Sequence, residues 1–133
     1  MGSQSVKYLL DTSTWIWANS DTAKLSRRAA EILKDPGATF GLSDISLWEV
    51  AKKVENGKLQ LDRPVLDWIR NALPDSVQVL PITPEISVAS TQLKNFHNDP
   101  ADQLIVATAQ SHGLTLLASD KLIRQGDWVK TVW

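Results

Sequence analysis

The sequence has 133 residues, of which 43% are hydrophobic and 22% are charged, and its formal net charge is -1. This length allows one hydrophobic core, so we expect a single domain over residues 1–133, and the charge balance excludes the broadly basic surface that many nucleic-acid-binding proteins carry. The absence of cysteine excludes disulfides and thiolate metal sites, and no apolar run approaches the roughly 18 residues of a membrane helix, so we expect a cytoplasmic protein without membrane contact.

Short apolar runs alternate along the chain with segments of helical periodicity. In chain order we expect strands at residues 6–10, 39–42, 77–82, 114–118 and 128–132, and helices at 12–18, 25–33, 45–56, 63–73, 84–95 and 99–112. The helix at 45–56 carries one apolar stripe with the spacing i, i+3, i+4 and i+7, formed by Leu47, Val50, Ala51 and Val54. The residues expected at helix N-caps are Asp11 or Thr12, Ser26, and Ser43 or Asp44.

The alternation of strands and helices indicates the fold class. Short strands followed by helices of about ten residues predict an α/β fold with right-handed crossovers and a short, mainly parallel sheet covered on both faces. In such sheets ligands bind beyond the carboxyl ends of the strands. Asp11 directly follows the first predicted strand, and Asp120 follows the strand at 114–118. We therefore expect both acids to lie at the edge of the sheet where ligands bind.

Each candidate acid also has a purely structural explanation. Asp11 and Asp120 each lie at a strand–helix junction, where an aspartate caps a helix well. In the segment NDPADQL, Asp99 fits an N-cap, and Asp102 fits the third helical position, where it accepts from free backbone N–H groups. Glu49 has a lysine four residues later, which is the spacing of an exposed ion pair. Taken singly, none of the five acids requires a function.

Together, the acids indicate a metal site. Several carboxylates that converge in one cleft repel each other unless they are protonated or share a cation. Oxygen ligands in a chain without cysteine suit a hard ion such as Mg²⁺ or Mn²⁺ rather than zinc. Such an ion binds phosphate oxygens and lowers the pKa of an attacking water, which is the chemistry of phosphodiester hydrolysis.

Four segments that contain these acids resemble the motifs of a known family. In chain order the segments are LLDTSTWIW, SDISLWEVAKK, HNDPADQLIVATAQ and LLASDKLI. They resemble the four acidic motifs of PIN-domain proteins and, more narrowly, those of the VapC-type toxins of toxin–antitoxin pairs. The resemblance extends from Tyr8 to about Trp133, and its most specific part is DPADQLIVATA.

The resemblance implies a three-layer α/β/α sandwich and a Mg²⁺- or Mn²⁺-dependent endoribonuclease. It implies that the catalytic, metal-holding residues are Asp11, Glu49, Asp102 and Asp120. Ser13 and Ser119 would assist by orienting the neighbouring acids or a bound water, and Asp99 would be an N-cap close to the metal. Members of the family are usually homodimers that a cognate antitoxin inhibits, so the expected partners are RNA, an antitoxin and a second copy of the chain.

One residue departs from the family pattern, and two alternatives to the nuclease remain open. Gln103 occupies a position where the family very often has arginine, and its amide cannot replace a guanidinium charge that holds phosphate. A catalytically weakened PIN-fold module that binds RNA or protein is therefore the alternative function. An aspartyl-phosphate phosphatase with Asp11 as nucleophile ranks behind it, because that chemistry favours a D-x-D pair and residue 13 is serine. His97 is interpreted as an exposed loop residue, with RNA contact or proton transfer as its functional alternatives.

Overall fold

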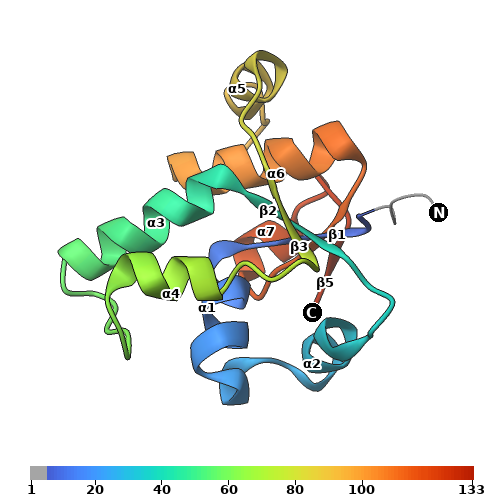
Figure 1. Ribbon diagram of the computed structural model, residues 1–133. Helices are drawn as coiled ribbons and strands as arrows, with labels where there is room; N and C mark the ends of the chain where they lie inside the picture. The colour runs from blue at the N-terminus through green and yellow to red at the C-terminus, as the bar shows by residue number, and fades with distance from the viewer. Residues whose placement is uncertain (1–5) are drawn as a thin grey trace.

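A computed structural model describes residues 6–133, and the expected alternation of strands and helices is present (Figure 1). The strands are β1 (Tyr8–Leu10), β2 (Phe40–Ser43), β3 (Val77–Leu80), β4 (Thr115–Leu117) and β5 (Thr131–Val132). The helices are α1 (Thr12–Ser20), α2 (Arg27–Lys34), α3 (Asp44–Glu55), α4 (Val65–Asn71), α5 (Pro84–Ser90), α6 (Pro100–His112) and α7 (Lys121–Gln125), with a short 3₁₀ helix at Thr22–Lys24.

The strands of the described residues form one five-stranded parallel sheet in the order β3-β2-β1-β4-β5. β1 lies in the middle, where Leu10 is in register with Leu42 of β2 and with Leu117 of β4. The carboxyl ends of these three neighbouring strands therefore lie side by side. The residues that follow β1 and β4 leave the sheet at the same edge, as the sequence predicted.

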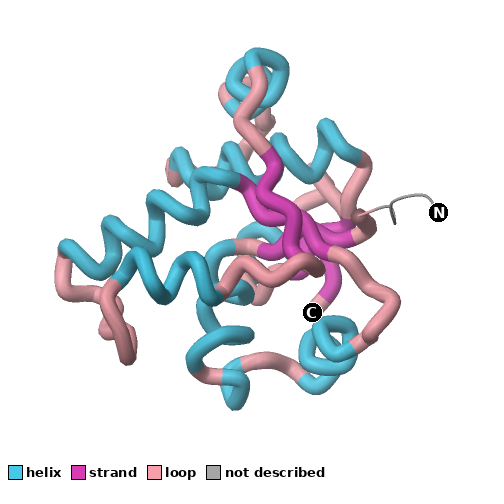
Figure 2. The backbone as a smooth tube through the Cα atoms, viewed as in Figure 1, coloured by secondary structure: helices cyan, strands magenta, loops and turns pink. Residues whose placement is uncertain are grey.

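Helices cover both faces of the sheet, and each face has its own hydrophobic core (Figure 2). Neighbouring residues of a strand point to opposite faces, so Leu10 joins one core and Leu9 the other. The first core contains Trp15 of α1 and Trp68 of α4, and the second contains Ile105 of α6. Complete burial of an aliphatic side chain such as Leu9, Leu10 or Ile105 contributes roughly 1.5–3 kcal/mol to the free energy of folding. This arrangement is the expected three-layer α/β/α sandwich with a short parallel sheet.

Local signals at the helix ends account for most of the helix boundaries. Ser26 caps α2 by accepting from the backbone N–H of Ala29 at 3.0 Å. Ser43, rather than Asp44, is the N-cap of α3. α6 ends at Gly113, whose φ of 65° lies in the left-handed region that glycine adopts without strain.

Two sequence predictions about the elements are clearly wrong in extent. The helix expected at 84–95 ends at Ser90, and Asn95 has a φ of 57°, a left-handed conformation that no helix continues through. The strand expected at 128–132 is restricted to Thr131–Val132, because the Trp128 indole N–H donates to the Lys94 carbonyl at 2.7 Å and the ring packs on the loop there. The 3₁₀ helix and α7 were not predicted.

The apolar stripe expected on α3 is only partly correct. Val50 is fully buried, and Leu47 packs against the same core. Ala51 is exposed, whereas Ser46 is buried on the neighbouring side of the helix, where its hydroxyl lies 2.8 Å from that of Thr12. α3 therefore presents a polar side chain to the start of α1.

No helix within residues 6–133 combines the length and apolar character needed to span a bilayer.

Candidate active site

The acidic pocket lies at the carboxyl edge of the sheet. It has a volume of about 280 Å³. Its lining residues come from the starts of α1, α6 and α7 and from the middle of α3, and they are Asp11, Thr12, Ser13, Glu49, Lys53, Asp99, Asp102, Ser119 and Asp120. All seven residues that the sequence singled out as catalytic or supporting are therefore brought together, and Thr12 and Lys53 join them.

Asp11 is both a helix cap and a buried member of the pocket. One of its carboxylate oxygens, Oδ1, accepts from the backbone N–H of Thr14 at 2.7 Å. The expected role of Asp11 as a helix cap is therefore confirmed, but it does not account for the position of the residue in the pocket. The side chain is only 7% exposed. Burial raises the pKa of Asp11 to about 6, against the opposing hydrogen bond from Thr14, and the charges of Asp102 and Asp120 raise it further.

Glu49 faces the pocket instead of forming the exposed ion pair that its spacing to Lys53 suggested. Its Oε1 accepts a very short hydrogen bond from the Thr12 hydroxyl, which also contacts the Ser46 hydroxyl. Burial raises the pKa of Glu49, although the Thr12 bond and the charge of Lys53 act in the opposite direction. From the sequence, Thr12 is expected to be no more than a possible cap, because a contact between residues 12 and 49 has no local signature.

The N-terminus of α6 supplies two further acids. Asp99 is the N-cap, and its Oδ1 accepts from the backbone N–H of Asp102 at 3.1 Å. Asp102 points into the acidic pocket, where burial raises its pKa and the His97 bond lowers it. The charge of Asp99 adds to the rise. The expected cap at Asp99 is confirmed, and the same residue also borders the pocket.

His97 is the clearest residue that sequence reasoning missed. It was expected to be an exposed loop histidine, but its side chain is only 24% exposed and its Nε2 lies 2.7 Å from Oδ2 of Asp102. Ligand atoms of His97, Asp102 and Asp120 all lie within 4.8 Å of one another. The only sequence signal was its position five residues before Asp102, which by itself does not predict a contact.

Asp120 and the two serines complete the pocket. Asp120 caps α7 by accepting from the backbone N–H of Leu122 at 2.8 Å. Ser13 and Ser119 both line the pocket beside the aspartates they were expected to assist. Asp11 and Asp120 follow paired strands, since the Asp11 backbone N–H donates to the Leu117 carbonyl at 3.2 Å.

The donor set of the pocket fits a hard divalent cation. Five carboxylates line one small space, and Lys53 is the only basic side chain among the lining residues. Burial and, to a smaller extent, nearby acidic charges raise the pKa of three of them, Asp11, Glu49 and Asp102, and so disfavour their ionised forms. A cation such as Mg²⁺ or Mn²⁺ prefers these oxygen ligands and would compensate their charge.

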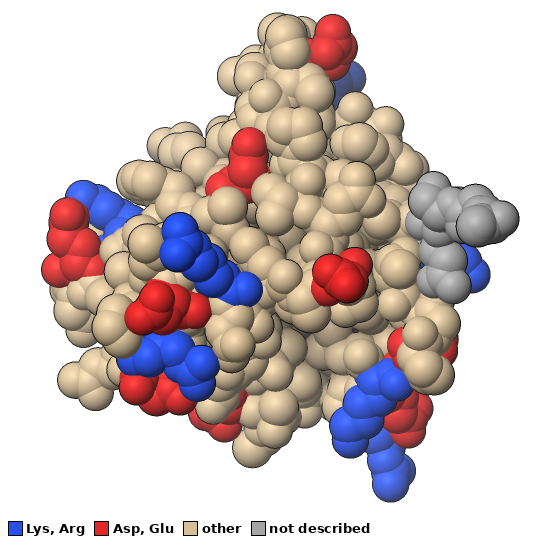
Figure 3. Space-filling view, in the orientation of Figure 1, with Lys and Arg blue, Asp and Glu red and all other residues tan. Residues whose placement is uncertain are grey.

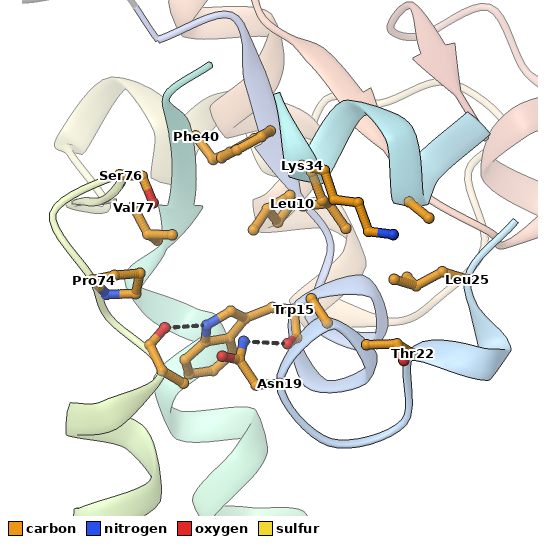
Figure 4. A pocket seen from close by; sticks show the side chains of 14 residues that line it. Leu10, Trp15, Asn19, Thr22, Leu25, Lys34, Phe40, Pro74, Ser76 and Val77 are labelled. Carbon is orange, nitrogen blue, oxygen red and sulfur yellow. Dashed lines mark hydrogen bonds between the residues drawn. The ribbon is translucent and has the colours of Figure 1, made fainter. Parts of the chain in front are cut away.

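A second cavity, of about 410 Å³, is apolar and shares no lining residue with the acidic pocket (Figure 4). Leu10, Phe40 and Val77 point into it, and Lys34 is the one charged residue in its lining. Trp15 also lines this cavity, and its indole N–H donates to the Ala72 carbonyl at 2.8 Å, which holds the ring in place. The lining of this cavity, all of it within residues 6–133, includes no carboxylate and no imidazole.

The surface charge agrees with the balanced composition. On the face shown in Figure 3, acidic and basic side chains are interspersed and separated by uncharged surface. A single-sign basic patch, of the kind that grips a nucleic-acid backbone, is not visible on this face.

Comparison with known proteins identifies relatives over nearly the whole chain. The model of the PIN-domain family matches residues 8–129. The chain is similar to Ribonuclease VapC22 of Mycobacterium tuberculosis, with 33% identity over 128 residues that cover 94% of this chain and 97% of the relative.

Solved structures with the same fold share less sequence. A DNA-bound VapBC complex from Salmonella typhimurium contains a chain with a TM-score of 0.74 and 19% identity, covering 96% of this chain and 98% of that one. VapC20 of Mycobacterium tuberculosis, described as a sarcin–ricin loop cleaving toxin, has a TM-score of 0.66 and 16% identity, covering 93% and 99%. At these identities the likeness establishes the fold.

Proposed function

This chain belongs to the PIN-domain family, and we propose that it is a metal-dependent endoribonuclease toxin of the VapC type. The observation that carries the proposal is the convergence of Asp11, Glu49, Asp102 and Asp120, from four separate segments, on one small acidic pocket. The similarity to a ribonuclease over 94% of the chain supports the same activity. Both sources of support are independent of the net charge, which by itself argues against a nucleic-acid function.

The four acids would bind Mg²⁺ or Mn²⁺, and hydrogen bonds from neighbouring residues would orient two of the acids. Such an ion, when bound, supplies Lewis-acid activation of the phosphate and of an attacking water. Thr12 orients Glu49 through its hydroxyl, and the Thr14 backbone N–H orients Asp11. Lys53, at the pocket wall, attracts the phosphate backbone of the RNA. Ser13, Ser119 and Asp99 then have supporting roles beside the metal ligands.

The partners follow from the relatives. The Salmonella structure is a VapBC complex, and we infer that this chain also has a protein partner, a cognate antitoxin that inhibits it. We also infer that the chain is a single domain, that it forms homodimers and that it acts in the cytoplasm.

A catalytically weakened binding module is the competing function, since Gln103 lacks the charge that the family usually has at this position. Its side-chain amide instead donates to the His97 carbonyl at 3.2 Å.

Cleavage of RNA by the purified, antitoxin-free protein tests the proposal. Total RNA is incubated with the protein and Mg²⁺ or Mn²⁺, and parallel reactions contain a chelator, the Asp11→Asn variant or the Asp75→Asn variant. We expect cleavage by the wild type and by Asp75→Asn, because Asp75 is an exposed acid outside the pocket. Chelation should abolish cleavage, and Asp11→Asn should lower its rate at least about 100-fold.

Two results would contradict the proposal. Metal-supported RNA binding without any cleavage would favour the binding module. Cleavage that persists both with the chelator and in Asp11→Asn would show that the activity does not arise in the acidic pocket.

A further inference from the structure

His97 is held in place by the residues around it. Its ring stacks on Phe96 with 4.3 Å between the ring centroids, and Phe96 packs edge-on against Trp128 at 4.7 Å. Its carbonyl oxygen accepts from the Gln103 side-chain amide at 3.2 Å and from the backbone N–H of Asp99 at 3.0 Å. The aromatic packing holds the imidazole ring, and the two hydrogen bonds hold the backbone of His97. Together they fix the position of the side chain.

The Nε2 edge of the ring faces the carboxylates of the acidic pocket. Nε2 lies 2.7 Å from Oδ2 of Asp102, and a carboxylate oxygen of Asp120 completes a group of three ligand atoms within 4.8 Å of one another. Within residues 6–133 this is the one group of histidine, aspartate and glutamate side chains that is close enough to share an ion as it stands. This potential ligand set contains a nitrogen.

These separations are those of ligands on a single small ion. An octahedral Mg²⁺ site with bonds of about 2.1 Å puts adjacent ligand atoms about 3 Å apart and opposite ones about 4.2 Å apart, and Mn²⁺ sites are slightly larger. The 2.7 Å between His97 Nε2 and Asp102 Oδ2 is a hydrogen bond whose length is also close to the adjacent spacing, and the 4.8 Å limit exceeds the opposite spacing by about 0.6 Å. An ion bound here would replace the hydrogen bond between Nε2 and Asp102, so His97 would bind it as the neutral tautomer that carries its proton on Nδ1.

We propose that His97 Nε2 is a direct metal ligand beside Asp102 and Asp120, and that it shifts the preference of the site from Mg²⁺ toward Mn²⁺. Carboxylate oxygens suit both ions, whereas imidazole nitrogen favours transition-metal ions over the hard Mg²⁺. Gln103 is then a positioning residue, because its amide holds the backbone of His97. This inference rests on the metal site of the proposed function and adds a ligand that the four-acid set does not contain.

Pulsed electron paramagnetic resonance of the Mn²⁺-loaded protein tests the ligand directly. We expect the nitrogen modulation of a coordinated imidazole in the wild type and in His112→Gln, which changes the other, exposed histidine at the end of α6. The modulation should be absent in His97→Gln. A wild-type spectrum without nitrogen modulation would overturn the proposal whether or not any variant folds, and so would a signal that persists in His97→Gln.

Calorimetric titration with Mn²⁺ and Mg²⁺ tests the preference. His97→Gln should weaken Mn²⁺ binding about tenfold or more and Mg²⁺ binding by less, whereas His112→Gln should change neither. His97→Glu restores an oxygen ligand, so it should recover binding with a lower ratio of Mn²⁺ to Mg²⁺ affinity and without the nitrogen signal. Equal losses for both ions in His97→Gln would contradict the claimed preference.

The outcomes separate this inference from the proposed function. Nitrogen coordination in a protein that does not cleave RNA would support the ligand assignment and contradict the nuclease. RNA cleavage with a metal centre free of nitrogen would support the nuclease and contradict the role of His97.

Discussion

Asp11 is at once the N-cap of α1 and a buried carboxylate of the acidic pocket. The cap occupies one oxygen, Oδ1, and a carboxylate has a second oxygen that remains available to a cation. A local structural role and a chemical role are therefore compatible in the same side chain. Asp99 and Asp120 repeat this pattern, since each caps a helix and also lines the pocket.

The raised pKa of Asp11 predicts how stability depends on pH in the metal-free protein. Burial raises this pKa from 3.8 to about 6, so the folded state binds the proton more tightly than the unfolded chain. The resulting stability is complete below about pH 3.8 and is lost as the pH rises through about 6. The loss amounts to at most about 3 kcal/mol from this residue.

Urea unfolding in the presence of a chelator, from pH 4.5 to 7.5, measures this effect. The free energy of unfolding should fall more steeply with pH in the wild type than in Asp11→Asn, which cannot ionise at this position. Glu49 and Asp102 have pKa shifts in the same direction, so a residual slope remains in the variant. Identical slopes for the two proteins would contradict the assigned origin.

At the scale of secondary structure, the position of the acids depends on helix starts. Asp11, Asp102 and Asp120 lie at or just after the N-termini of α1, α6 and α7, whose partial positive charge favours carboxylates there. Only Glu49 comes from the middle of a helix, and the Thr12 hydroxyl orients its carboxylate. The starts of three helices therefore build most of the pocket.

Two substitutions at Asp99 separate its capping role from a role at the metal. Asparagine caps as well as aspartate, so Asp99→Asn should change the free energy of unfolding by only a few tenths of a kcal/mol, whereas Asp99→Ala should cost about 1 kcal/mol. RNA cleavage by Asp99→Asn should stay within about tenfold of the wild type, while Asp102→Asn should lose the larger, at least 100-fold factor. Urea unfolding and cleavage rates measure both effects. Loss of cleavage in Asp99→Asn to the level of Asp102→Asn would make Asp99 a metal ligand.

At the scale of the whole molecule, the acidic pocket joins segments that are far apart in the chain. Asp11, Glu49, Asp102 and Asp120 belong to regions that pack on different parts of the sheet. A shared ion bound only by the folded protein would therefore link these regions and stabilise the entire fold. Asp11, Glu49 and Asp102 also destabilise the metal-free protein near neutral pH, because burial and, to a smaller extent, nearby acidic charges raise their pKa values and oppose their ionisation.

Thermal unfolding with and without metal measures this linkage. At a free Mn²⁺ concentration about 100 times its dissociation constant, the stabilisation is about 2.7 kcal/mol, and we expect the midpoint at pH 7.5 to rise by roughly 10 °C over a chelator control. Asp102→Asn should lose most of this rise. A wild-type midpoint that is indifferent to Mn²⁺ would be evidence against a metal site in the folded protein.

The sequence alone predicted the α/β alternation, the parallel sheet covered on both faces, and the sheet edge where Asp11 and Asp120 lie. These features follow from apolar periodicity and N-cap residues, which are local properties of the chain. The catalytic and metal-binding roles of the acids stay predictions that the structure makes geometrically reasonable. Short elements such as α7 escaped prediction because five residues carry too little periodicity to be recognised.

Only the tertiary structure decided which side chains meet inside the pocket. The Thr12–Glu49 bond depends on how α1 and α3 pack, and the His97–Asp102 contact depends on the chain reversal near Asn95. Neither contact has a local signature, because the direction of a side chain is set by the packing and backbone conformation of distant segments. Sequence patterns could therefore place the acids at one edge of the sheet, but the ring nitrogen beside them became visible only in three dimensions.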